Sequence, residues 1–373
     1  MSIPAVSRSE KLPRAGEGPR EDRLRRPVWQ PALLVGVAGA VVLGVLAALS
    51  RHETLPRGDD LIYEKMARHP FATHTFPFAY RIGLPALVYV SPFSHTVSFE
   101  LLALVGAGGA AGFAFALIRR LGAPAALAAA LALCLAVSPP MLIVLLRQGR
   151  NTDALTMLFM MVGALFVIER RTRALALVLL VGVVFREAVL FVIPLAYAAW
   201  AERPLDVHAA RRALALGAPA VLAFVGLHLA LSSVGRASVP GYGGSLIAGR
   251  VDVVEAGLKT LPTEARRMFS VFGPLWLAAP LALASSRYAR RGLALVACAL
   301  AAMTFALDWG RMIFLAAPAF YLAGAHTLTR HSRWRAPALA AFGLLILAYA
   351  IYMDRSGVQH GIIENPPPPY PVR

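Results

Sequence analysis

The sequence predicts an all-α, polytopic membrane protein, and two observations support this fold class. Hydrophobic residues make up 58% of the 373 positions, charged residues only 15%, and the mean hydropathy is +0.63, which is too apolar for a soluble domain. Long apolar stretches also recur along the chain between short polar links. We therefore expect a transmembrane helical bundle of about ten or eleven membrane segments within residues 28–353.

The first apolar stretch, residues 29–50, is long enough to cross about 30 Å of hydrocarbon as a helix. Arginines at 23, 25 and 26 precede it, so we expect an uncleaved first span with a cytoplasmic N-terminus. Further spans are expected at residues 98–118, 124–146, 154–168, 174–185, 187–200, 213–232, 271–286, 292–307, 312–328 and 336–353.

The short links on the expected cytoplasmic side are rich in arginine, which indicates that orientation in a bilayer, rather than nucleic-acid binding, explains much of the net charge of +17. The long outer loops are then 51–97 and 234–270. Residues 1–27 are typical of a disordered cytoplasmic tail, and residues 354–373 of a proline-rich extracytoplasmic tail.

The stretches 174–185 and 187–200 are each too short to cross a membrane alone and are joined at Arg186 without a loop. One continuous span would place Arg186 and Glu187 at mid-bilayer, where each charge costs about 2.5 to 3.5 kcal/mol. We prefer a broken hairpin that meets at the outer face, because it keeps the alternation of arginine-rich links.

Charged residues close to the spans gather at their outer ends, which suggests a site for chemistry or for binding an anion. Arginine suits a phosphate because its guanidinium donates several hydrogen bonds in a fixed fork. The residues concerned are Asp59, Asp60, Arg81, Arg147, Arg150, Asp153, Arg186, Glu187, Asp308 and Arg311.

The first outer loop carries the clearest chemistry. The pattern from Leu61 to Met66 predicts a short helix lying in the membrane interface. Asp59 or Asp60 would cap it, and the spare carboxylate would then serve as a general base or a metal ligand.

Simpler interpretations stand beside the functional one for several residues. Arg311 has Asp308 three residues away as an ion-pair partner, and Asn151 or Thr152 would cap the next helix. The glycine-rich piece of the loop 234–270 is either a mobile lid or an inert connection.

No metal site is expected from the cysteines and histidines. Cys134 and Cys298 both lie inside apolar stretches. The spacing of the outer histidines matches no zinc template. The histidines concerned are His52, His69, His74 and His95.

Taken together, these landmarks resemble bacterial membrane glycosyltransferases of the GT-C superfamily, from about residue 30 to residue 330. The resemblance rests on an aspartate in the first outer loop, on the order of the landmarks, and on three short motifs. The motifs are Tyr80-Arg81-x-x-x-Pro85, Arg186-Glu187 and the Asp-Trp-Gly-Arg of residues 308–311.

The resemblance implies that a sugar moves from a polyprenyl-phosphate carrier to an acceptor at the outer face of a bacterial inner membrane. It implies Asp59 or Asp60 as the base, with Glu187 and Asp308 as secondary acids. Membrane lipids and an acceptor of unspecified class are the other expected partners. No cofactor is required, although a divalent cation remains an option. The alternatives are a transporter or lipid flippase, and a noncatalytic GT-C-like protein.

Overall fold

The computed structural model describes most of the chain between the two predicted tails. The predicted tail 1–27, most of the tail 354–373 and the glycine-rich piece of the loop 234–270 fall outside the described residues. No strand occurs within the described residues, so this part of the protein is all-α, as predicted. The described residues are 28–50, 59–70, 78–146, 150–232, 254–255, 257–259, 261–305 and 308–356.

Helices follow one another with short connections. Four of the elements are 3₁₀-helices, labelled η. In chain order, the elements are α2 (Trp29–Ser50), α3 (Asp59–Arg68), η1 (Phe78–Tyr80), α4 (Gly83–Tyr89), α5 (His95–Arg120), α6 (Ala125–Ala136), α7 (Pro139–Leu146), α8 (Asp153–Glu169), α9 (Thr172–Val183), η2 (Glu187–Phe191), α10 (Val192–Trp200), α11 (Val207–Ser232), α13 (Leu261–Phe272), α14 (Leu275–Ala282), α15 (Arg287–Ala302), η3 (Met303–Phe305), α16 (Trp309–Phe314), α17 (Ala317–Arg330), η4 (Ser332–Trp334) and α18 (Arg335–Ser356).

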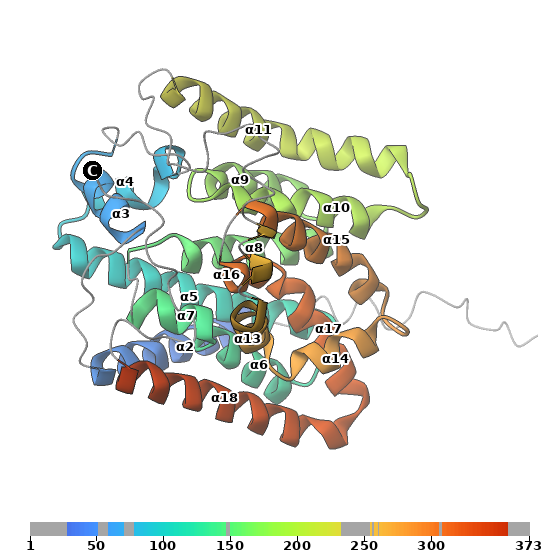
Figure 1. The fold of residues 1–373 in the computed structure, drawn as a ribbon. Helices are drawn as coiled ribbons and strands as arrows, with labels where there is room; N and C mark the ends of the chain where they lie inside the picture. Colours follow the sequence, from blue (N-terminus) through green and yellow to red (C-terminus); the bar gives the residue numbers. More distant parts are fainter. Residues whose placement is uncertain are drawn as a thin grey trace, which may run out of the picture.

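Four helices are long and apolar enough to cross a membrane, and they lie in α2, α5, α11 and α18. In α5 the most apolar stretch is 67% buried by protein, against 22% in α2 and 17% in α11 and α18. Figure 1 shows why, since α11 and α18 run along opposite edges of the bundle and α5 lies between them. The apolar outward faces of α2, α11 and α18 fit contact with lipid and are consistent with a multi-pass membrane protein.

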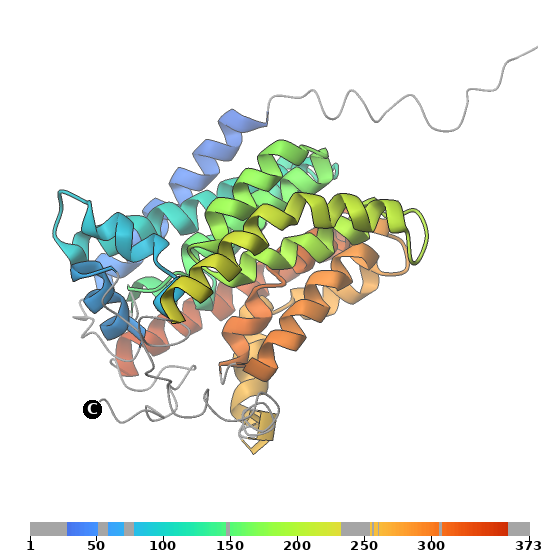
Figure 2. The ribbon, with the colours of Figure 1, turned by 90° about the horizontal axis from the view of Figure 1, so that it is seen from above.

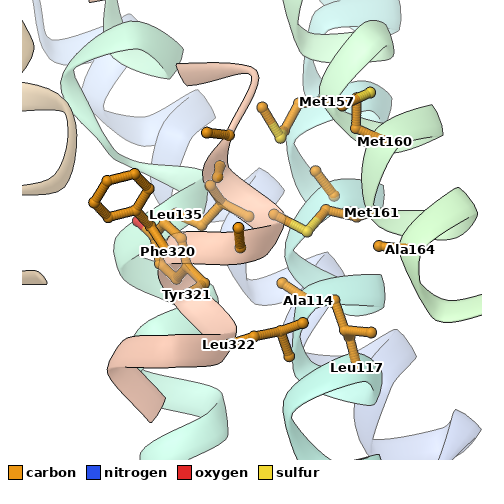
Figure 3. Packing of buried hydrophobic residues seen from close by; sticks show 14 of the residues in the cluster. Ala114, Leu117, Leu135, Met157, Met160, Met161, Ala164, Phe320, Tyr321 and Leu322 are labelled. Atoms are coloured by element: carbon orange, nitrogen blue, oxygen red, sulfur yellow. The ribbon is translucent and has the colours of Figure 1, made fainter. Parts of the chain in front are cut away.

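Small residues bring the central helices together. A Cβ added to Gly106 of α5 would lie 2.7 Å from the main chain of Ala154 and Leu155 in α8, so the two backbones touch here. Further along the same interface, methionines of α8 pack against α5, α6 and α17 (Figure 3). The labelled side chains include Met157, Met160 and Met161.

The short helices α3 and α4 lie together at one end of the bundle in both views (Figures 1 and 2). The helices α5 and α8 begin at this end, which we call the outer end. The opposite, inner end holds the links after α5, α8 and α10. The predicted short helix after Asp59 and Asp60 is confirmed as α3, and the predicted break at Arg186 is confirmed because α9 ends at Val183 and η2 begins at Glu187.

Three of the predicted spans are wrong as single helices, because the structure divides each of them near a proline. The span 124–146 becomes α6 and α7, separated just before Pro139, and the span 312–328 becomes α16 and α17, with Pro318 in the first turn of α17. Proline lacks an N–H and is accommodated best in the first turn of a helix, so at these positions it favours the start of a new helix over continuation of the old one.

The third divided span, 271–286, also shows an error in the predicted loop 234–270. The helix α13 begins at Leu261, inside that loop, and ends at Phe272, before Gly273 turns the chain with a φ of +47° and Pro274 precedes α14. The helix is strongly amphipathic, and its charged residues concealed it from a search for uniformly apolar stretches.

Candidate functional site

Two guanidinium groups converge on one carboxylate at the outer end. Asp153 begins α8, and its Oδ1 forms an ion pair with Arg186, which lies in the turn between α9 and η2. Its Oδ2 accepts a hydrogen bond from Nε of Arg311, in α16, at 2.6 Å. Asp153 is 7% exposed and Arg186 5% exposed, so water does little to screen this contact. One buried carboxylate thus joins three segments that lie far apart in the sequence.

The start of α8 explains how Asp153 is held. Thr152 is the residue before the helix, and the side-chain oxygen of Asn151 accepts the backbone N–H of Asp153 at 2.9 Å. A negative charge in the first turn of a helix is also favoured by the helix dipole. The helix therefore starts at the predicted place with Thr152 at the cap position, but the side chain of Thr152 makes no capping hydrogen bond, and the Asn151 side chain instead orders the turn.

A second ion pair lies beside the first. Arg81 Nε donates to Glu187 Oε2 at 2.9 Å, and Arg81 Nη2 donates to Glu187 Oε1, so the two planar groups meet through two hydrogen bonds. The backbone N–H of Gly83 donates to the carbonyl of Val184 at 2.9 Å, which fixes the Arg81 segment against the turn that carries Arg186 and Glu187.

Arg186 lies between these two pairs and in the field of both neighbouring arginines. Burial, together with the positive charges of Arg81 and Arg311, lowers the pKa of Arg186 to about 10. No hydrogen-bond acceptor is within reach of its Nε in the described part of the chain. Three guanidinium groups therefore meet the carboxylates of Asp153 and Glu187 at this position. Guanidinium groups gathered in this way are suited to bind the oxygens of an anion.

The helix α3 lies over the network. Tyr63 of α3 is 1% exposed and close enough to Arg81 and Arg186 to affect both electrostatically. Asp60 is 1% exposed and lies one turn earlier on the same helix. The helix begins at Asp59, so both aspartates lie in its first turn, where the helix dipole favours a negative charge. The side chain of Asp59 is outside the described part of the structure.

Arg150 belongs to a separate cluster on the other side of α3. Its Nε lies 2.9 Å from Glu64 Oε2, and its Nη2 donates to Thr96 Oγ1 at 3.1 Å. The ring Nδ1 of His95 lies 3.1 Å from Glu64 Oε1. This cluster ties α3 to the start of α5 and to the segment before α8.

Asp308 has a structural contact that sequence reasoning did not anticipate. Its Oδ1 accepts the backbone N–H of Arg311 at 3.0 Å and caps α16. Glu264 of α13 accepts the N–H of Trp309 at 3.2 Å and pairs with Arg267, so it holds the same short helix from the other side. Burial raises the pKa of Glu264, and the charge of Asp308 raises it further.

The predicted site residues therefore fall into groups according to the contacts that they make. Four of them share one network, namely Arg81, Arg186, Glu187 and Arg311. Arg150 lies in the Glu64 cluster, Asp308 caps α16, and Asp60 lies on α3. Arg147 falls outside the described residues.

Three residues that matter here were missed or undervalued. Asp153 was counted among the outer charges but given no role of its own in the site, yet its carboxylate binds two arginines. Glu64 and Glu264 lie on amphipathic helices, where a charge is normally assigned to a solvated face. Their burial, 2% exposed in the case of Glu264, is a tertiary property with no local signal in the sequence.

Comparison with known proteins identifies no family for this sequence. No family model matches the sequence, and no curated protein matches it significantly. Across the described residues, no three or more histidine, cysteine, aspartate or glutamate side chains gather in a way that would hold a metal ion. A functional inference for this chain therefore depends on the charged network itself.

Proposed function

We propose that the protein is a membrane glycosyltransferase of the GT-C type, which moves a sugar from a polyprenyl-phosphate carrier to an acceptor at the extracytoplasmic face. In this proposal the chain crosses a bacterial inner membrane about ten or eleven times, with its N-terminus in the cytoplasm. The outer end of the bundle then faces the periplasmic side, where the carrier presents its sugar.

The observation that supports this function is the convergence of Arg81, Arg186 and Arg311 at one buried position beside the carboxylates of Asp153 and Glu187. The Nε of Arg186 has no acceptor there among the described residues, and a phosphate oxygen would occupy that position. The same guanidinium groups would stabilise the negative charge that develops on the leaving phosphate.

The transfer itself needs a base. The acceptor hydroxyl would attack the anomeric carbon, the bond from that carbon to the phosphate oxygen would break with its electron pair, and a carboxylate would take the hydroxyl proton. We assign this role to Asp60 or Asp59. Both lie in the first turn of α3, the helix whose Tyr63 lies close to Arg81 and Arg186.

The test uses a host strain that lacks its own copy of the gene, complemented with Asp59→Asn, Asp60→Asn and the double variant. Mass spectrometry of envelope lipids and glycans then identifies the sugar that depends on the gene. Asp206→Asn is the matched control, because it makes the same chemical change at an exposed helix start at the inner end.

We expect at least one aspartate variant on α3 to lower product formation by about 100-fold or more at normal protein level, as loss of a general base does. The control should keep the wild-type level. A double variant with full activity would remove the proposed base.

One observation favours the noncatalytic or transporter alternative instead. Both carboxylates of the network, Asp153 and Glu187, are already engaged by arginines, as expected for a purely structural lock or a gate. Under that alternative, Asp60→Asn leaves the envelope lipids and glycans unchanged. Arg186→Gln then alters folding or transport but no sugar transfer.

A further inference from the structure

The helix α13 turns its polar side toward the rest of the protein. Its buried residues include Glu264, Arg267 and Ser270, and the first two are only 2% and 3% exposed. Leu261 and Phe269 lie on the other side of the helix and are 46% and 52% exposed. An amphipathic helix at the surface of a water-soluble protein has the reverse arrangement, with its apolar stripe against the core. This arrangement indicates apolar surroundings for α13.

The exposed apolar residues of α13 form one stripe, which consists of Leu261, Ala265 and Phe269. These residues are four positions apart, and side chains at this spacing lie above one another on the same face of an α-helix. All three are exposed, and Arg266 is exposed at the margin of the stripe. An arginine at such a margin lays its apolar stem along lipid and keeps its guanidinium group near water.

Contacts with α16 fix which side of α13 faces outward. Glu264 Oε2 accepts the backbone N–H of Trp309 at 3.2 Å, and Glu264 also pairs with Arg267. A Cβ added to Gly310 of α16 would lie 3.2 Å from the Cβ of Arg267, so the two helices touch along the polar side of α13. Rotating α13 to bury its stripe would break these contacts. The stripe is therefore held outward.

The position of α13 in the fold agrees with a place at the membrane surface. Figure 2 shows α13 at the edge of the bundle, and Figure 1 looks along it while α5 and α18 run across the picture. The helix thus crosses the direction of the long helices. The next helix, α14, follows the turn at Gly273 and exposes Leu277 and Leu281. Exposed apolar side chains therefore continue along the chain from the predicted loop into the predicted span.

We propose that α13 is an interfacial membrane helix whose stripe lies among the acyl chains of the outer leaflet. Most of α13 belongs to the predicted outer loop 234–270, so the inference moves this part of the loop into the membrane surface. Interfacial helices bury their apolar face about 5–10 Å into the boundary between headgroups and acyl chains. Because α13 holds the start of α16, it links the outer leaflet to the helix that carries Arg311. The inference does not depend on the proposed transferase activity.

The experiment measures the surroundings of single nitroxide labels on the full chain. The protein is placed in phosphatidylcholine nanodiscs large enough to hold a second copy. Cys134 and Cys298 are first replaced by alanine, so that the label attaches only to an introduced cysteine. The test variants are Ala265→Cys and Phe269→Cys, and the matched control on the same helix is Arg266→Cys.

Two further labels supply the reference values. Leu344→Cys, on the exposed face of α18, is the reference for lipid, and Arg203→Cys, in the link after α10, is the reference for water. All five labelled positions are exposed, so the substitutions should leave thermal unfolding unchanged. Electron paramagnetic resonance gives the collision rate of each label with molecular oxygen, which concentrates in lipid, and with a nickel chelate, which stays in water.

We expect the ratio of oxygen to nickel collision rates at positions 265 and 269 to be shifted from the value at position 203 toward the value at position 344. The ratio at position 266 should be lower than at either test position, because Arg266 lies at the margin of the stripe.

Three results would overturn the proposal. The first is a ratio at positions 265 and 269 no higher than at position 203, which would place the stripe in water. The second is a low collision rate with both reagents at these positions, which would mean that protein, such as a second copy of the chain, covers the stripe. The third is an equal ratio at positions 265, 266 and 269, because an interfacial helix has one face in lipid and the other outside it.

Discussion

The arginines at the two ends of the bundle bind different kinds of partner. At the inner end they mainly bind backbone carbonyls where helices finish: Arg290 donates to Leu283, Arg291 to Ala199 and Ala201, and Arg335 to Leu328 and Thr329. At the outer end they bind carboxylates from distant segments, as Arg81 does with Glu187 and Arg186 with Asp153.

This difference distinguishes arginines that are explained by the orientation of the protein in a membrane from arginines that suggest a functional site. Carbonyls at the end of a helix lack partners within the helix, so an arginine there satisfies them while its charge stays near water. Such arginines fit a rule of membrane orientation and need no further role. A buried ion pair instead carries a large desolvation cost, and it is weak evidence for stability alone. The outer network therefore calls for a functional explanation in a way that most inner arginines do not.

The largest effect should come from Asp153→Asn, because it leaves Arg186 and Arg311 facing each other without their shared carboxylate. We expect a loss of about 3–5 kcal/mol in the free energy of unfolding. Glu169→Gln is the inner-end counterpart, since Glu169 also binds two arginines.

The loss in Glu169→Gln should be smaller, about 1–3 kcal/mol, because the side chain of its partner Arg171 is 52% exposed and regains water. Thermal unfolding of both variants in detergent measures the difference. Equal losses would mean that the two ends do not differ in the way described above.

Arg81→Lys tests the two-point contact with Glu187. Lysine keeps the charge but cannot form both hydrogen bonds of the planar fork. The loss of one charged hydrogen bond should lower the free energy of unfolding by about 2 kcal/mol. The exposed inner-end change Arg211→Lys serves as control and should leave stability unchanged. If Arg81→Lys leaves the free energy of unfolding unchanged, charge alone maintains this pair.

Gly106→Ala tests the close packing that places α8, and with it Asp153, against α5. The added methyl group would meet the backbone of α8 at 2.7 Å, and we expect a loss of about 1–3 kcal/mol. Gly226→Ala is the matched control, because nothing lies within 4 Å of its added Cβ, and it should be neutral or slightly stabilising. Thermal unfolding of both variants measures the difference. Unchanged stability of Gly106→Ala would refute a contact between the two backbones.

The smallest effect concerns an inner-end carboxylate. The backbone N–H groups of Ala209, Glu202 and His208 hold the pKa of Asp206 below its ordinary value of 3.8. The charged cap of α11 therefore contributes its full stability above that pH and loses it as the pH falls through the lower folded-state pKa.

The difference in melting temperature between wild type and Asp206→Asn should thus shrink as the pH is lowered from 6 to 3. A difference that stays constant over this range would show that the charge of Asp206 is irrelevant to the cap.

Local sequence patterns predicted much of the fold. Uniform hydrophobicity located α2, which runs from Trp29 to Ser50, and the charge at Arg186 marked the break after α9. The helix α13 was missed because an amphipathic helix lacks a long apolar run, and the divided spans were missed because a proline starts a new helix without interrupting the apolar run.

The candidate site was predictable in its residue types but not in its pairing. The sequence placed Arg81, Arg186, Glu187 and Arg311 at one end of the bundle, and the structure joins them. The choice of Asp153 as the shared partner depends on how closely α8 approaches α5 and α16. That approach is set by packing between residues 48 positions apart in the case of Gly106 and Ala154, and by a contact over 158 positions between Asp153 and Arg311, which no local pattern records.

The most direct test of the proposed site is an experimental structure of the protein with a polyprenyl phosphate bound. We predict that the phosphate lies within hydrogen-bonding distance of Arg186, between its partner Asp153 and the Arg81–Glu187 pair. A phosphate bound elsewhere, with the contacts of Arg186 to Asp153 and of Arg81 to Glu187 unchanged, would contradict the account.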